Sequence, residues 1–219
     1  MSDGFQFDTF YVQHALCAMK VGTDATLLGN WCKIPANLSH VEVLDIGTGS
    51  GVLSLMLAER LTRSDLSFHI DAIDMDSSAY EQATKNAQQS IYKPFISVFQ
   101  TSLQAFSPDK VYQIIICNPP FFSSLLPPDT ARQNARHTNN LTMQDLAKKV
   151  SKLLAPEGLF SVILPFEQLY EALYWTQINH LYPTHITKIY TTETPLAKRV
   201  LMAFSKNYTP DFQITSQTV

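Results

Sequence analysis

The chain has 219 residues, of which 45% are hydrophobic and 16% are charged, and its formal net charge is −3. This length suits one α/β domain with a full core, and the composition is that of an ordinary globular protein. No apolar run approaches the ~20 residues of a membrane span. The negative charge excludes a strong general binder of polyanions, so any contact with nucleic acid must come from a local patch.

The three cysteines are widely spaced. Cys17, Cys32 and Cys117 form neither a CxxC pair nor a metal-ligand pattern. The amino terminus also lacks the charged-then-apolar pattern of a signal peptide. An odd number of separated thiols fits a reducing compartment. We therefore expect a cytoplasmic protein, a monomer, with no metal and no membrane contact.

From residue 41 onward, short apolar segments alternate with segments of helical length. The last two strands have no helix-length segment between them, so we expect them to be antiparallel. The pattern predicts an α/β fold, a doubly wound, seven-stranded and mostly parallel sheet with one antiparallel edge strand, in the Rossmann-like manner. Strands are expected at residues 41–46, 68–73, 95–99, 111–117, 159–164, 186–191 and 199–205, and helices at 52–61, 77–89, 142–154 and 166–179.

Residues 1–40 stand outside this alternation. They contain a plausible short helix at 24–31 and an aromatic-rich start with Phe5, Phe7 and Phe10. We expect residues 1–40 to lie over the carboxyl edge of the sheet as a lid segment of the same domain as residues 41–219. A loosely docked tail is the alternative for residues 1–12.

A glycine cluster follows the first strand and opens the first helix, in the segment DIGTGSG at residues 45–51. Glycines there allow a tight turn and the close approach of a ligand to the backbone. A dinucleotide site has the spacing G-x-G-x-x-G, but Val52 stands where its third glycine would fall. Asp45, before the first glycine, would repel a pyrophosphate and suit a cationic ligand with a free amine.

S-Adenosylmethionine (SAM) is such a ligand, because it carries a sulfonium and an ammonium group. Asp74, at the end of the second strand, is placed to accept hydrogen bonds from two ribose hydroxyls. The alternative for Asp74 is an ordinary surface acid next to a helix.

The segment Asn118-Pro119-Pro120-Phe121 follows the fourth strand. Two prolines stop a strand and stiffen the loop at its carboxyl end, where open α/β sheets bind ligands. The Asn118 amide oxygen and the Pro119 carbonyl can accept from a planar NH2 group, and Phe121 can stack on its ring. The same residues could also simply end the strand, with Phe121 in the core.

Together, VLDIGTGSG, AIDMD and IIICNPPF resemble the class I SAM-dependent methyltransferases. The segment CAMKVGTDATLLGNW, residues 17–31, is similar to the bacterial family that methylates N6 of the adenine 3′ to the anticodon of a valine tRNA. The resemblance covers residues 4–205. It implies an enzyme with SAM as cofactor and tRNA as partner.

The resemblance also implies roles for individual residues. One position departs from the family pattern, because Ser102 stands where many such enzymes carry an acid that binds the SAM adenine. Arg132 and Arg136 are candidates for contact with the tRNA because of their position, in the long loop that directly follows Phe121, and Lys198 and Arg199 are further candidates. Ordinary solvated charge is the alternative for each of these residues. Asn118, Pro119, Pro120 and Phe121 would hold the target base. The SAM site would comprise Lys20, Gly22, Thr23 and Asp24, over the methionine end, together with Asp45, Gly47, Gly49, Asp74, Met75, Ser102 and Leu103.

Two other classes of function stay open. An amino methyltransferase could act on guanine N2 in rRNA, a DNA adenine or a protein glutamine. Glutamine enzymes usually carry Tyr where Phe121 stands, and DNA enzymes commonly carry Asp where Asn118 stands. A module that binds SAM or RNA without catalysis would not need the rigid amide of Asn118.

Overall fold

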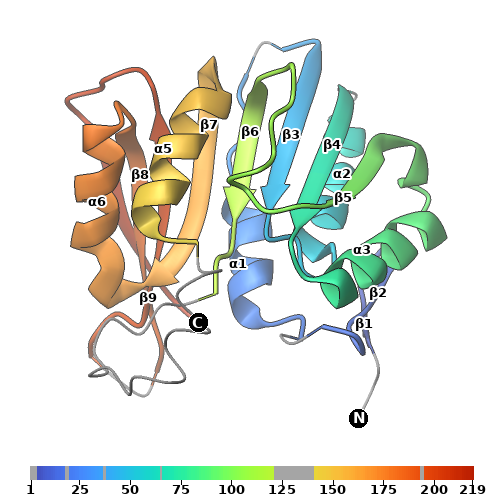
Figure 1. Ribbon diagram of the computed structural model, residues 1–219. Coiled ribbons are helices and arrows are strands. Elements are labelled where there is room, and N and C mark those ends of the chain that lie inside the picture. Colours follow the sequence, from blue (N-terminus) through green and yellow to red (C-terminus); the bar gives the residue numbers. More distant parts are fainter. Residues whose placement is uncertain (1–3, 18–19, 37, 65, 121–140, 193–194) are drawn as a thin grey trace, which may run out of the picture.

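The computed structural model describes residues 4–17, 20–36, 38–64, 66–120, 141–192 and 195–219. It contains an eight-stranded sheet flanked by helices and a separate two-stranded sheet, β1-β2 (Figure 1). Within these ranges, no helix has the length and apolar character needed to cross a membrane. The strands are β1 (Gly4–Gln6), β2 (Tyr11–Gln13), β3 (His40–Ile46), β4 (Ser67–Asp74), β5 (Ile96–Gln100), β6 (Tyr112–Cys117), β7 (Leu154–Pro165), β8 (Tyr182–Tyr190), β9 (Arg199–Ser205) and β10 (Gln213–Thr218).

The large sheet has the order β10-β8-β9-β7-β6-β3-β4-β5. Its strand pairs are parallel except those of β9, which is antiparallel to both β7 and β8. This confirms the mostly parallel, doubly wound α/β fold. Two details differ from the prediction, because the reversed strand lies inside the sheet and β10 adds an eighth strand at the edge. All six residues of β10 are exposed, so no apolar pattern marks it in the sequence.

Helices cover both faces of the sheet. Helices α1 and α2 share one apolar cluster with the residues that point to one face, including Val43 and Ile114. Helices α5 and α6 share the other, with Leu44 and Ile115. This alternation of neighbours along each strand explains why the central strands are apolar throughout. The helices are α1 (Thr23–Trp31), α2 (Val52–Arg63), α3 (Ser77–Gln89), α5 (Met143–Leu153) and α6 (Leu169–Ile178), with short 3-10 turns η1 (Lys93–Phe95) and η2 (Phe166–Gln168).

The amino-terminal segment is docked on the domain. In the β1-β2 hairpin region, Phe10 and Val12 are buried. The Asn86 side chain of α3 accepts from Gln13 N at 3.0 Å and donates to Gln13 O at 2.7 Å. Figure 1 places this segment at the end of the molecule where the parallel strands finish. The described part of residues 1–12 is therefore not a loose tail, and the function of residues 1–40 as a lid stays a prediction.

Two side-chain hydrogen bonds join helix α1 to strands β8 and β9 of the large sheet. Trp31 Nε1 donates to Thr187 Oγ1 of β8 at 2.9 Å. Arg199 Nε, at the start of β9, donates to Asp24 Oδ2 at 2.9 Å. These contacts place the start of α1 beside the carboxyl ends of the central strands.

Candidate active site

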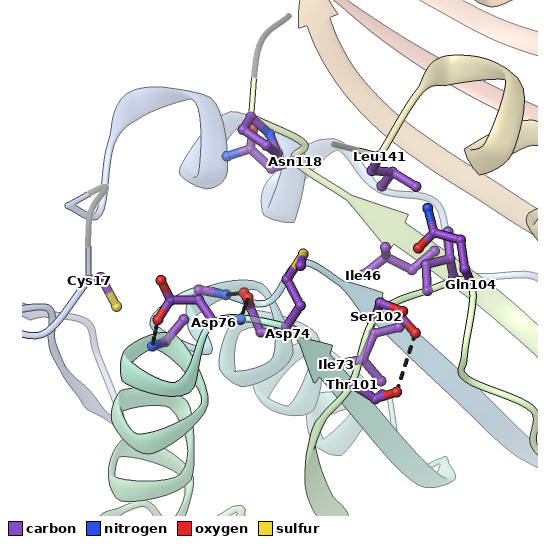
Figure 2. A pocket seen from close by; sticks show the side chains of 16 residues that line it. Cys17, Ile46, Ile73, Asp74, Asp76, Thr101, Ser102, Gln104, Asn118 and Leu141 are labelled. Atoms are coloured by element: carbon purple, nitrogen blue, oxygen red, sulfur yellow. Dashed lines mark hydrogen bonds between the residues drawn. The ribbon is translucent and has the colours of Figure 1, made fainter. Parts of the chain in front are cut away.

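Two adjoining cavities lie at the carboxyl edge of the sheet. The first is bounded by the glycine loop after β3, the end of β4, the loop after β5 and the end of β6 (Figure 2). The second is bounded by the start of α1, the same glycine loop and the first turn of α2. Gly47, Gly49 and Asn118 line both cavities. The two cavities therefore meet at the glycine loop and the amide after β6.

The glycine loop adopts a conformation that side chains disfavour. Gly47 has φ 69° and Gly49 has φ 57°, both in the left-handed region. A Cβ at either position would meet nothing within 4 Å, so its side chain would project into open space. The backbone N–H of Gly47 donates to Ile73 O at 2.9 Å, which holds the loop against β4. The loop thus offers its bare backbone to a ligand.

At the floor of the first cavity, Asp74 connects the glycine loop after β3 with the loop after β4. Its Oδ2 accepts from Gly49 N at 2.9 Å and its Oδ1 accepts from Asp76 N at 3.0 Å. Figure 2 shows Asp74 across the cavity from Asn118. Each carboxylate oxygen can accept more than one hydrogen bond. Asp74 therefore combines a structural role in the loops with the ability to receive hydroxyls from a ligand.

Asp45 lies behind the glycine loop and lines neither cavity. It is fully buried, and its Oδ2 accepts from Thr48 Oγ1 at 2.7 Å, from Ser54 Oγ at 2.7 Å and from Ser54 N at 3.1 Å. Its position in this structure differs from the predicted direct contact with a cationic ligand. Asp45 instead joins the loop to the first turn of α2, so it acts on the site through the backbone.

The burial of Asp45 predicts a dependence of stability on pH. Burial raises the pKa of Asp45 from 3.8 to about 6, although the bonds from Thr48 and Ser54 oppose the shift. The folded chain therefore binds this proton more tightly than the unfolded chain. The resulting stability is full below about pH 4 and is lost as the pH rises through about 6.

Replacement by asparagine, Asp45→Asn, removes this titration and puts an uncharged amide of the same shape in place of the carboxyl group. Between pH 4 and 7 we expect the free energy of unfolding of the natural chain to fall by roughly 2 kcal/mol relative to the variant. Chemical denaturation at several pH values measures this difference. Parallel pH profiles for the two proteins would contradict the assignment.

Asn118 carries an acceptor without a partner at the point where the cavities meet. It directly follows Cys117, the last residue of β6, and it is half-buried, while Pro119 is buried and Pro120 is exposed. Among the described residues, no hydrogen bond reaches Asn118 Oδ1, which is itself buried. A buried polar atom without a partner costs roughly 1–3 kcal/mol. The orphaned oxygen therefore points to a hydrogen-bond donor on a ligand.

A comparison with protein families identifies this arrangement. The model of the family described as "Methyltransferase small domain" matches residues 25–190. The chain belongs to this methyltransferase family. The match includes the glycine loop, Asp74 and Asn118, whereas residues 20–24 and Arg199 of the second cavity lie outside the matched range.

Curated relatives of this methyltransferase cover nearly all of the chain. A protein of Parabacteroides distasonis named tRNA1(Val) (adenine(37)-N6)-methyltransferase is 42% identical over 205 residues, which are 92% of this chain and 83% of the relative. A protein of the same name from Pectobacterium carotovorum is 39% identical, over 93% of this chain and 81% of the relative.

Solved structures share the fold at lower sequence identity. A predicted O-methyltransferase from Agrobacterium tumefaciens matches with a TM-score of 0.63 and 18% identity, over 90% of this chain and 86% of that chain. A ribosomal protein L11 methylase from Lactobacillus delbrueckii matches with a TM-score of 0.61 and 17% identity, over 90% and 84% of the two chains. At this level of identity the likeness supports the fold alone.

The structure brings most of the predicted site residues of this methyltransferase together. Pro119 and Asp45 line neither cavity, and Phe121, Arg132 and Arg136 lie outside the described residues. The predicted residues in the first cavity are Gly47, Gly49, Asp74, Met75, Ser102, Leu103, Asn118 and Pro120. Those in the second cavity are Lys20, Gly22, Thr23, Asp24, Gly47, Gly49 and Asn118.

The first cavity also includes residues that the sequence analysis did not predict. Gln104 lies in the same loop as Ser102, and Figure 2 shows both on the side of the cavity opposite Cys17. Ser102 Oγ accepts from Ala105 N at 3.2 Å, so it also shapes this loop. Gln104 lies two residues after Ser102, and this proximity in the sequence could have predicted that Gln104 also lines the cavity. The other additions include Cys17, Asp76, Thr101 and Leu141.

Proposed function

We propose that this protein is a SAM-dependent methyltransferase that acts on N6 of adenine 37 in a valine tRNA. The names of relatives at about 40% identity support the choice of acceptor. The observation that carries the chemistry is the buried, unpartnered Oδ1 of Asn118 where the two cavities meet. An acceptor held rigidly at that point suits an aromatic amine.

The residues of the first cavity fit the adenosine part of SAM. Asp74 offers a carboxylate for the ribose hydroxyls at the end of β4. Ile46, Ile73 and Leu103 supply apolar surface for the adenine ring. Ser102 and Gln104 supply uncharged polar groups for the ring edge. When bound, SAM supplies an activated methyl group beside Asn118.

Asn118 would activate the acceptor. An adenine amine is a poor nucleophile because its lone pair is delocalised into the ring. Asn118 Oδ1 would accept a hydrogen bond from one N–H of the amine, and the Pro119 carbonyl would accept one from the other. Together these bonds draw the nitrogen toward a tetrahedral geometry and localise its lone pair. The remaining rate acceleration comes from positioning, which can contribute ~7–11 kcal/mol.

The acceptor must leave its stack to enter the site. Unstacking costs least for a base in a single-stranded loop, such as the anticodon loop of a tRNA. Phe121 is proposed to stack on the base, which is worth ~1–3 kcal/mol, and Arg132 and Arg136 are proposed to contact the RNA backbone. We also propose that the protein works in the cytoplasm, which its three free cysteines support.

Incubation with labelled SAM tests this function. Separate samples of tRNA, rRNA, DNA and protein, all from cells that lack the enzyme, serve as acceptors. We expect label only in tRNA. Label in rRNA, DNA or protein would contradict the proposed acceptor, and binding of SAM without transfer to any of the four would indicate a binding module.

A further inference from the structure

An ion pair at the second cavity joins two distant parts of the chain. Arg199 Nε donates to Asp24 Oδ2 at 2.9 Å, and the two side chains are 32% and 24% exposed. Both residues line the second cavity. A partly buried pair adds little net stability, because both charges lose contact with water on burial. The contribution of this ion pair to the stability of α1 therefore does not by itself explain why the Arg199 guanidinium lies at this cavity.

The charges around the second cavity favour an anion. Lys20 lines it together with Arg199, against the single carboxylate of Asp24. Val52 and Leu53, in the first turn of α2, form another wall. The amino end of a helix favours negative charge, since its backbone N–H groups point outward there. The described lining thus combines two cations with a favourable helix end.

The first cavity has the opposite character. It is lined by the carboxylates of Asp74 and Asp76 and by apolar side chains such as Ile73. Gly47, Gly49 and Asn118 line both cavities, so one ligand can extend from one into the other. Such a ligand would place hydroxyl groups beside the acids and a negative group beside the cations.

We propose that Arg199, oriented by Asp24, binds the α-carboxylate of SAM in the second cavity. The proposal rests on SAM as the methyl donor. A guanidinium pairs with a carboxylate through two parallel N–H···O bonds, and a partner on Nε fixes the plane of the fork. Arg199 is then a cofactor-binding residue and Asp24 a positioning residue, in place of the tRNA contact expected for Arg199 from the sequence.

A phosphate of the RNA substrate would present similar chemistry to Arg199. The carboxylate is favoured because the same glycine loop bounds both cavities, so the negative end of SAM lies within reach once its adenosine occupies the first. Decarboxylated SAM separates the two sources, because it lacks only the α-carboxylate and keeps the sulfonium and the amine.

Calorimetric titration of SAM and of decarboxylated SAM tests the assignment. We expect Arg199→Met to weaken SAM binding by roughly 10- to 100-fold, the effect of losing hydrogen bonds to a charged group. Binding of decarboxylated SAM should change less than about twofold, because that ligand never makes the contact. Arg199→Lys, which keeps the charge and loses the fork, should give a smaller loss for SAM only. Lys85→Met, an exposed cation on α3, is the matched control and should change neither ligand.

Three results would overturn the proposal. An equal loss for both ligands would mean that the pair only holds α1 against the sheet. Unchanged SAM binding, with a smaller salt dependence of tRNA binding, would assign Arg199 to an RNA phosphate. If the natural chain bound SAM no better than decarboxylated SAM, no residue would bind the carboxylate. Failure of the natural chain to bind either ligand would instead refute SAM as the donor, and with it the proposed function.

Discussion

Replacement of Asn118 by alanine should reduce methyl transfer by at least roughly 10²–10³-fold, the usual cost of removing one preorganised hydrogen-bonding group from an active site. The side chain lines both cavities, and its Oδ1 is buried without a partner among the described residues. Loss of that oxygen leaves the acceptor amine flat and unreactive. Single-turnover assays with saturating SAM and tRNA measure the chemical step directly.

The control for this variant is the binding of SAM. Asn118 lines both cavities, but its Oδ1 is proposed to bond the acceptor amine and not SAM, so the affinity for SAM in Asn118→Ala should stay within about threefold of the natural value. Asn118→Asp keeps an acceptor oxygen in a side chain of the same shape and should retain more activity than alanine. A methyl-transfer rate in Asn118→Ala equal to that of the natural chain would refute the proposed role of the Asn118 amide in activating the acceptor.

Replacement of Asp74 by alanine should weaken SAM binding by roughly 100-fold, because two hydrogen bonds from the ribose to a charged acceptor are lost. The carboxylate also accepts from Gly49 N and Asp76 N, so its removal frees the glycine loop from the end of β4. Both effects act in the same direction. Calorimetric titration of SAM gives the affinity.

Asp74→Asn separates the two effects. Asparagine keeps one acceptor oxygen, so it can preserve the bond from Gly49 N while it loses the negative charge. We expect a loss of roughly tenfold for this variant, between the natural chain and alanine. Lys85→Met, an exposed residue of α3 that lines neither cavity, is the control and should leave SAM binding unchanged. A loss of less than about threefold in Asp74→Ala would exclude Asp74 as the ribose acceptor.

The elements that form the site could be read from local sequence. The glycine cluster, Asp74 and the Asn-Pro-Pro segment each follow an apolar strand, and parallel strands end at a common edge. The structure places all three around the first cavity. The direction of the Asp45 side chain could not be predicted from the local sequence. It depends on hydrogen bonds from Thr48 in the glycine loop and from Ser54 in α2, which form only once the loop and the helix are in place.

Other parts of the site depend on contacts between distant segments. Cys17 lines the first cavity, where its neighbour Leu16 is held by a hydrogen bond from Leu16 N to Gln82 Oε1 of α3 at 3.1 Å. No periodic pattern in the sequence predicts this contact. The ion pair of Asp24 with Arg199 joins residues 175 positions apart. The place of β9 within the sheet is likewise a matter of long-range pairing. Local propensity carries no information on these contacts.

The activity proposed for this chain is methylation of N6 of adenine 37 in a valine tRNA. The most direct measurement is mass-spectrometric mapping of a valine tRNA transcript after incubation with the protein and SAM, beside the same transcript with guanine at position 37. We expect N6-methyladenosine at position 37 of the first transcript and no methyl group on the second. A methyl group at another position, or on another base, would contradict it.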